Sequence, residues 1–586
     1  MLDLRQRAVL GEEPATPVSA VRLIGVAMLL AAILGVLEMF GEIGDGYFAG
    51  WGDHFVLSPE GLSWAHPGAF LNDWFMEAAP QPHWFFDAMT YAGESLGVLS
   101  LFYAVFWALG LVAFGAATAL LAYRFVPAAP IAAALGVTLV TAVTPWMIGG
   151  TGSPVIAQAL PAVLSAQLIY LLIAGLLTER RLLVVLLAPA IAIVHVQQGS
   201  IAIVLLVAML VVEGVRLRKL DWALVLALVL TGAFVVFGLT IRPIASNLQD
   251  FVAICDQIIV YHCAAHMWSN AEHYSTIGLI VLTCLSAFVV PRSSRWIWFT
   301  TVGLATLGYA GGYAADALRI PLLDTLAQGV NVYRLGALLL PFAMWGAVAP
   351  LLVRLRGWLA VLLIAVCGAA WFGFLMAPGW PTPSRRWLVL MVAALVVPAF
   401  VFLLWTRRSR GSDLATRSRA TRVSALSAGL LVVMVTAVLG GLTVRVPNFA
   451  FIQDANLRAW GEQVRDAVPE GSVLVASPRS EWVKLVTQRA VIADCKDIPY
   501  GGPAWQEWHR RIAFLGGYEQ CVAPGPLLYD QLPARALVDV ADQFRSDFIV
   551  VNPAAEPTAE ALEELGWTRV VTIVGGSGGE LLQRPN

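Results

Sequence analysis

Charge is scarce in this chain. Only 13% of its 586 residues are Asp, Glu, Lys or Arg, against roughly 25% in ordinary soluble domains. With 59% hydrophobic residues and a mean hydropathy of +0.74, the composition excludes a wholly soluble protein and predicts a polytopic α-helical membrane protein in contact with a lipid bilayer. The net charge of -2 and the pI near 6.5 provide no basic field, so nucleic acid is not expected as a partner.

Several familiar signatures are missing as well. The chain contains no P-loop, no G-x-S-x-G motif, no C-x-x-C pair and no internal repeat. No A-x-A cleavage site follows the first apolar run, residues 23–39, which therefore predicts an uncleaved anchor. The six cysteines are too few and too scattered for a disulfide framework. Cys255 with Cys263 and Cys495 with Cys521 can each form a bridge in an oxidising compartment, and unpaired thiols are an equal alternative.

Apolar windows long enough to cross a bilayer recur along the chain. About thirteen are expected, with centres near residues 30, 110, 137, 166, 188, 206, 231, 282, 303, 344, 366, 395 and 434. Short cytoplasmic loops accumulate Lys and Arg, and every even-to-odd connection is basic if the N-terminus lies inside. The pattern predicts a cytoplasmic segment 1–20 and a transmembrane domain 21–445 in the inner (plasma) membrane.

The composition changes abruptly near residue 446. Residues 446–586 have the pattern of a soluble α/β domain, and an odd number of spans places it outside the cytoplasm. Strands are expected at 472–477, 490–493, 548–551, 569–574 and 580–582, with GGSGG (575–579) as a hairpin turn. The polar and aromatic stretch 494–511 is interpreted as a surface that docks on the membrane part, or alternatively as a glycan-binding patch.

The first outer loop, residues 41–97, is the main candidate for a working site. Acids and histidines are crowded there among tryptophans, a side chain that favours the membrane interface. In the predicted topology all eight histidines of the chain lie on the outer side. The acids and histidines of the loop that bear on the argument are Asp45, Asp53, His54, Asp73, Glu77, His83, Asp87 and Glu94.

Three later outer segments add polar groups. His195, Gln197 and Gln198 follow the fifth span, where they either contact a sugar or merely solvate a helix end. His262 and His266 have a spacing that zinc sites use, but no adjacent Glu or third ligand accompanies them, so no metal is expected. The segment 311–334 carries Arg319 and Arg334. An arginine at the mouth of a span either snorkels or binds a phosphate.

Taken together, the many spans, the acid-bearing first outer loop and the outer C-terminal domain resemble the GT-C class of integral membrane glycosyltransferases. The strings WGDHFVLSPEGLSWAHPGAFLNDWF and DCKDIPYGGPAWQEWHRR are also similar to what an uncharacterised bacterial membrane family of this layout would contain. The resemblance implies transfer of a sugar from a polyprenyl-phosphate carrier to a glycan, lipid or protein acceptor, with a carboxylate of the first outer loop as catalytic group. The paired acids of some GT-C members are absent.

These roles fit the chemistry of the residues. Inverting transfer needs a base for the acceptor hydroxyl and cations or donors for the leaving phosphate. We assign the base to Asp53, with Asp73 as the next choice, although either can be a simple turn or cap residue. Arg334 is the expected phosphate clamp and Arg319 its reserve. Sugar or acceptor contacts are assigned to His54, His195, Gln197 and Gln198, and no cofactor is expected.

Two other classes of function stay open. A multi-span transporter or lipid flippase with an outer accessory domain predicts discontinuous helices and a polar site at mid-depth in the bilayer. A binding module anchored by its spans is the third reading, but one span would suffice for an anchor. Only the transferase reading brings Asp53 or Asp73, Arg334 and His195 to one outward-facing site.

Overall fold

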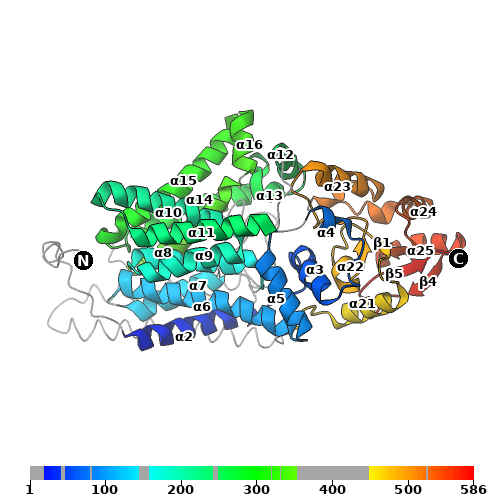
Figure 1. Ribbon diagram of the computed structural model, residues 1–586, viewed down its shortest axis with the longest axis horizontal. Coiled ribbons are helices and arrows are strands. Elements are labelled where there is room, and N and C mark those ends of the chain that lie inside the picture. Colours follow the sequence, from blue (N-terminus) through cyan, green and yellow to red (C-terminus); the bar gives the residue numbers. More distant parts are fainter. Residues whose placement is uncertain are drawn as a thin grey trace, which may run out of the picture.

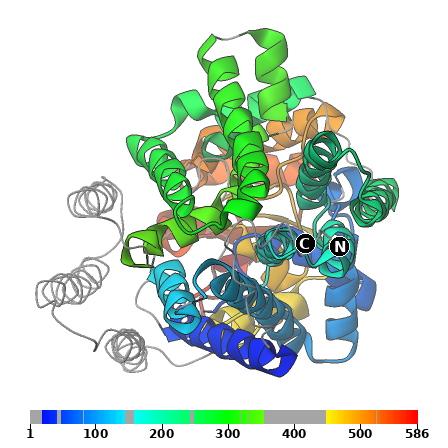
Figure 2. The same cartoon turned by 90° about the vertical axis from the view of Figure 1, so that its left-hand side faces the viewer.

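The computed structural model describes residues 19–40, 47–79, 82–127, 129–143, 158–241, 248–318, 320–329, 331–352, 448–522 and 525–585. Within these ranges an apolar helical part and a sheet domain lie end to end along the long axis of the molecule (Figure 1). Figure 2 looks along that axis, and both views show α15 and α16 standing out from the other helices. The described part of the chain is therefore a polytopic helical membrane protein with a C-terminal sheet domain.

The membrane part is built from helices that are apolar on nearly all faces. Helix α8 is buried inside it, whereas α2, α9, α10 and α11 expose leucine or valine to the surroundings. Such a distribution fits a lipid-facing surface. The helices are α2 (Ala20–Phe40), α6 (Leu99–Phe125), α7 (Pro130–Val143), α8 (Pro161–Leu177), α9 (Arg181–Val194), α10 (Val196–Leu217), α11 (Trp222–Ile241), α14 (Asn270–Ser286), α15 (Arg295–Leu318) and α17 (Leu340–Leu352).

Length and composition decide which of these helices can span a bilayer alone. Among the described residues α2, α6, α10 and α11 pass on both counts, and a bent pair formed by η3 (Val332–Leu338) and α17 is a fifth candidate. Helices α7, α8 and α9 are apolar but shorter than the roughly 20 residues that a perpendicular span needs. The predicted spans near 366, 395 and 434 lie outside the described residues, so the count of about thirteen stays a prediction.

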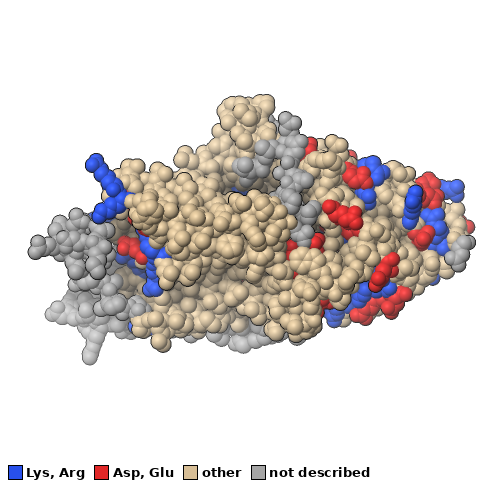
Figure 3. All heavy atoms as spheres, viewed as in Figure 1, with Lys and Arg blue, Asp and Glu red and all other residues tan. Residues whose placement is uncertain are grey.

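Charged side chains gather at the two ends of the molecule. Figure 3 shows a broad belt without Asp, Glu, Lys or Arg between them. At the end away from the sheet domain, Arg181 pairs with Glu213 and with Asp221. A belt of this kind is the surface that the hydrocarbon of a bilayer requires.

Short helices fill the junction between the membrane helices and the sheet domain. The first outer loop contributes α3 (His54–Ala65), α4 (Trp74–Ala78) and α5 (Trp84–Ser95). The loop between α11 and α14 contributes α12 (Leu248–Gln257), α13 (Val260–Cys263) and η1 (Ala265–Met267). Remaining elements of the helical part are η2 (Arg292–Ser294) and α16 (Pro321–Gly329).

The sheet domain has five strands in the order β2-β1-β3-β5-β4. Strand β1 (Val473–Val475) pairs in parallel with β2 (Ala490–Val491) and β3 (Phe548–Val551), whereas β5 (Glu580–Gln583) runs antiparallel to β3 and β4 (Thr568–Val571). The GGSGG segment turns between β4 and β5, which confirms the predicted hairpin. Helices of this domain are α21 (Ala455–Ala467), α22 (Trp482–Thr487), α23 (Gly502–Phe514), η4 (Tyr518–Cys521), η5 (Tyr529–Gln531), α24 (Ala534–Gln543), η6 (Pro553–Ala555) and α25 (Glu556–Glu564).

Alternating strand residues give this sheet two apolar faces. Leu474, Phe548 and Val550 face α21 and α22, while Ile549 and Val551 face α23, α24 and α25. The second core extends beyond the domain, because Trp74 of α4 and Ile254 of α12 belong to it. The sheet domain therefore shares a continuous hydrophobic core with the outer loops of the membrane part.

Polar contacts reinforce this shared core along the predicted docking stretch 494–511. The Gly502 N–H donates to the Asp250 carboxylate at 2.6 Å, and the Arg511 guanidinium lies 4.8 Å from the Trp74 ring centre. These contacts confirm the docking interpretation of the stretch.

The two parts also approach closely at a second place, outside this stretch. Gly50 has a φ of +65°, and a Cβ there would lie 2.1 Å from the carbonyl oxygen of Phe451.

Candidate functional site

Asp53 lies at this junction, immediately before α3. Its Oδ1 is 2.7 Å from the Nζ of Lys496, a residue of the sheet domain, and its side chain is 50% exposed. Gly52 precedes it with a φ of +63°, a backbone conformation that glycine adopts at little cost. The carboxylate is thus half exposed at the meeting point of the two parts.

Charges from several elements act on this carboxyl group. The surrounding protein raises the pKa of Asp53 by desolvation, but the attraction of Lys496, followed by that of His262 and His54, outweighs it and leaves the pKa below its usual range. Asp53 is therefore ionised at neutral pH, as a proton acceptor must be.

His54, the next residue, points into the protein. It is fully buried, its Nδ1 is 3.1 Å from the Ser58 hydroxyl, and its ring packs edge-on against Tyr103. Burial lowers the pKa of His54 to about 3, so the ring is neutral. The structure thus places His54 in the core beneath Asp53, where it supports α3 and has no open path to a sugar.

His83 of the first outer loop contacts a residue at the end of two membrane helices. It precedes α5, and its ring centre is 5.0 Å from that of His195, at the junction of α9 and α10. Burial lowers the pKa of His83 to about 4, with Asp53 opposing this shift and Arg334 adding to it. The His83 ring thus contacts His195, and the charges of Asp53 and Arg334 both act on it.

Asn331 fixes the position of Arg334. With its amide oriented to satisfy both neighbours, its oxygen accepts from Arg334 Nε at 3.2 Å and its nitrogen donates to the carbonyl oxygen of His262 at 3.2 Å. Asn331 has a φ of +49°, in the left-handed region where Asn is enriched. His262, whose carbonyl oxygen Asn331 contacts, also lowers the pKa of Asp53.

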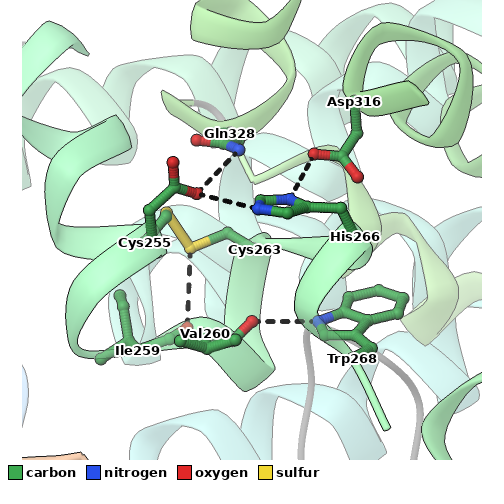
Figure 4. The surroundings of a disulfide bond; sticks show 9 residues. Cys255, Ile259, Val260, Cys263, His266, Trp268, Asp316 and Gln328 are labelled. Carbon is green, nitrogen blue, oxygen red and sulfur yellow. Dashed lines mark hydrogen bonds and ion pairs between the residues drawn. A yellow bond between two sulfur atoms is a disulfide. The ribbon is translucent and has the colours of Figure 1, made fainter. Parts of the chain in front are cut away.

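The histidine pair 262/266 does not share a helical face. Helix α13 ends at Cys263 and η1 begins at Ala265, so the i, i+4 geometry assumed from the sequence is wrong here. Figure 4 shows His266 turned toward Asp316, with Nδ1 2.7 Å from its Oδ1. In the part of the chain that the structure describes, no three His, Cys, Asp or Glu side chains are placed to hold a metal ion.

Disulfide bonds hold two of the segments that supply site residues. Cys255–Cys263 ties α12 to α13 beside His262 (Figure 4), and Cys495–Cys521 closes the sheet-domain loop beside Lys496. For both cysteine pairs the structure therefore has a disulfide bridge rather than two unpaired thiols. Disulfides persist in oxidising compartments, which fits an outer location for both segments.

Removing the sheet-domain bridge is expected to destabilise that domain. Closing a 26-residue separation restricts the unfolded chain, so a Cys495→Ser/Cys521→Ser variant should lose about 3 kcal/mol of unfolding free energy. Thermal unfolding of the full chain in detergent, with and without a phosphine reductant, measures this loss. The reductant should lower the melting temperature of the parent protein more than that of the variant, and equal responses would contradict a formed bridge.

Asp73, the second candidate base, is buried at the same junction. Its Oδ1 caps α4 by accepting from the Met76 N–H at 3.0 Å, and its Oδ2 is 3.9 Å from the Nζ of Lys484. Lys484 also pairs with Asp497, and the side chains of all three are at most 2% exposed. Asp73 is therefore placed to hold the sheet domain against the first outer loop.

The remaining predicted site residues, Gln197, Gln198 and Arg319, differ in how far they are buried and in whether the structure describes them. Gln198 is buried and its backbone N–H donates to His195 Nδ1, whereas Gln197 is half-buried on α10. The Gln198 contact makes Nδ1 the acceptor, so a neutral His195 carries its proton on Nε2. Arg319 lies outside the described residues.

Sequence reasoning missed three groups of this site: Lys496, His83 and Glu481. Burial raises the pKa of Glu481 to about 7, with Asp494 adding to this shift and Lys496 opposing it. The available signal was the rarity of lysine in an arginine-rich chain. Apart from Lys219, the lysines of the chain are Lys484 and Lys496, and each contacts one of the two candidate acids.

Comparisons with known proteins give the following likenesses. A family described as a domain of unknown function (DUF6798) matches residues 455–514, a range that contains Lys484 and Lys496. No curated protein matches the chain.

Three solved structures illustrate the similarity in fold. ArnT from Cupriavidus metallidurans bound to undecaprenyl phosphate is similar at 14% identity and a TM-score of 0.49, over 96% of this chain and 98% of that one. The Archaeoglobus fulgidus oligosaccharyltransferase in its apo form is similar at 11% identity and a TM-score of 0.42, over 91% and 69%. Arabinofuranosyltransferase AftD from Mycobacteria is similar at 14% identity and a TM-score of 0.42, over 98% of this chain and 40% of that one.

Proposed function

We propose that this chain is a membrane glycosyltransferase of the GT-C class that moves a sugar from a polyprenyl-phosphate carrier to an extracytoplasmic glycan, lipid or protein acceptor. One observation carries the proposal: where the membrane helices meet the sheet domain, the half-exposed Asp53 carboxylate lies 2.7 Å from the Lys496 ammonium group, and the charges of Asp53 and Arg334 both act on His83. A base and cations in one place are what transfer from a lipid phosphate requires.

The reaction we propose is a single displacement. The acceptor hydroxyl oxygen attacks the anomeric carbon, the bond from that carbon to the phosphate oxygen breaks, and the electron pair leaves with polyprenyl phosphate. Asp53 takes the hydroxyl proton, and the anomeric configuration inverts. Arg334 stabilises the charge that develops on the phosphate, and its orientation is set by Asn331.

The proposed orientation places the N-terminus in the cytoplasm and the sheet domain outside, in the inner (plasma) membrane. Both disulfides lie in outer segments under this orientation. The opposite end of the membrane part carries basic residues at helix ends and in loops, such as Arg180, Arg181, Arg216 and Arg218, as the positive-inside rule predicts.

A reconstituted assay tests the proposal. The full chain in lipid nanodiscs is incubated with polyprenyl-phosphate hexoses and pentoses and a cell-envelope extract as acceptor, and the products are analysed by mass spectrometry. We expect release of polyprenyl phosphate together with a glycosylated acceptor, and neither product in an Asp53→Asn variant. Release by both proteins alike would remove Asp53 from the reaction.

The transporter reading has one supporting feature, the 46° bend between η3 and α17. However, Arg334 on η3 is linked through Asn331 to His262 of α13, at the junction with the sheet domain, which supports a break near that end of the helical part rather than at its middle. A fluorescent lipid-phosphate probe that moves between leaflets of proteoliposomes, with no sugar transferred in the nanodisc assay, would favour the flippase reading instead.

A further inference from the structure

The junction holds a lysine whose position is unusually well defined. The Asp494 Oδ1 accepts from the backbone N–H groups of Lys496 at 2.8 Å and Asp497 at 2.7 Å, and Trp508 Nε1 donates to the Asp494 carbonyl at 3.0 Å. The neighbouring Cys495 is bridged to Cys521. The backbone that carries Lys496 is thus fixed on both sides, and only its flexible side chain is left to move.

That side chain reaches from the sheet domain to Asp53 and is itself 29% exposed. Lysine is a point charge on a four-carbon stem, so its ammonium group can change partner without any change in the backbone. Arginine, the commoner cation of this chain, would make a planar two-pronged contact with a carboxylate instead. A lysine is the better residue where a cation has to leave one anion for another.

The pair also poses a chemical problem for the reaction. A carboxylate held by an ammonium group at 2.7 Å is a weak base, because the cation stabilises its ionised form. It becomes a better base when the cation leaves, and the phosphate of a lipid-linked donor is the anion that can draw the cation away. Movement of the lysine from the carboxylate to the phosphate then provides both a stronger base for the acceptor proton and a cation for the leaving phosphate.

Resting on the proposed function, we propose that Lys496 is an active-site residue supplied by the sheet domain: it holds Asp53 before the donor binds and passes to the donor phosphate when the donor arrives. The carboxylate is thereby released to accept the acceptor proton, and the leaving phosphate gains a second cation beside Arg334. The sheet domain would thus complete the active site as well as cover it.

The titratable and charged groups around this pair come from four segments. His54 belongs to the first outer loop, His262 to α13, Asp494 to the loop after β2, and Glu481 with Arg479 to the segment before α22. Burial raises the pKa of Glu481 to about 7. A Glu481→Gln background therefore removes its titration from any pH profile of the site.

Binding of undecaprenyl phosphate to the full chain in nanodiscs tests the inference directly. We expect Lys496→Met to weaken binding by about 10- to 100-fold, the loss of one charge-assisted contact, and Lys496→Arg to retain most of it. Asp53→Asn should bind the lipid phosphate more tightly than the parent protein, because Lys496 is then free of its first partner. Lys219→Met, the same change in an exposed loop at the far end of the helical part, is the matched control.

The pH profile of transfer separates an active role from a structural one. In the Glu481→Gln background, Lys496→Met should move the acidic limb of kcat/KM upward, since the pKa of Asp53 rises when the attraction of Lys496 is lost. Unchanged lipid-phosphate binding and an unchanged limb in Lys496→Met would overturn the inference while the transfer function stands. A parent protein that neither binds undecaprenyl phosphate nor transfers sugar would remove both.

Discussion

Replacing Asp53 by Asn is expected to lower kcat for sugar transfer by about 10²- to 10⁴-fold, the contribution usual for a positioned general base. The amide has nearly the shape of the carboxylate but cannot take the acceptor proton. The side chain is half exposed and its main partner, Lys496, is 29% exposed, so the variant should fold normally. Initial rates with saturating donor, together with a thermal melting curve, measure the two effects separately.

A matched control distinguishes loss of the base from loss of charge. Asp539→Asn changes an exposed carboxylate on α24, away from the junction, and should retain full activity. Asp53→Glu keeps the base but moves it by one methylene, so it should recover part of the lost rate. If Asp53→Asn transferred sugar within about threefold of the parent protein, general-base catalysis by this residue would be ruled out, since even the lower end of the usual contribution is larger.

The local patterns of the sequence predicted secondary structure well. Apolar windows located ten of the described membrane-part helices, because hydrophobicity over about 20 residues is a strong signal. The five strands of the sheet domain were also expected at the observed places, with ends shifted by up to three residues. Helix α22 was missed, because it is only six residues long and presents no clear period.

The contacts of the site were harder to predict, since they join residues that are distant in the chain. Asp53 and Arg334 were expected to lie together, and the charges of both act on the pKa of His83, a residue that had no assigned role. Asp53 and Asp73 looked equivalent in the sequence as acids among aromatics. Their difference comes from the sheet domain, which leaves Asp53 half exposed and buries Asp73 against Lys484.

The buried cluster around Lys484 has more acids than bases. Burial, Asp494 and Asp73 raise the pKa of Asp497 well above its usual value against the attraction of Lys484, and burial likewise raises that of Asp494. Burial opposes the charge on Lys484, but Asp497, Asp73 and Asp494 outweigh it and raise the lysine pKa. The lysine thus stays charged, while the cluster holds protons that the unfolded chain would release.

Replacing Lys484 by Met is therefore expected to cost about 3–5 kcal/mol of unfolding free energy at neutral pH, the usual result of leaving buried carboxylates without their cation. The folded state retains protons on Asp497 above pH 4 that the unfolded state loses, so the stability contributed by this group falls as pH rises. Without Lys484 the carboxyl groups hold protons more strongly still. The difference in unfolding free energy between the parent protein and the variant should therefore shrink as pH falls toward 4. Thermal unfolding of the full chain and limited proteolysis of the sheet domain, each at pH 5 and pH 8, measure it.

A second substitution tests whether the loss arises from charge. Asp497→Asn in the Lys484→Met background removes the carboxyl group closest to the missing cation, and should restore part of the stability at pH 8. Lys219→Met is again the control for the same change on an exposed loop, where only small effects are expected. A Lys484→Met protein as stable as the parent at both pH values would mean that the cluster does not hold the sheet domain in place. Lys496 reaches Asp53 only when the sheet domain is docked, so Lys484→Met should also slow sugar transfer. The rate of the variant, divided by that of the parent protein at the same pH, should be lower at pH 8 than at pH 5.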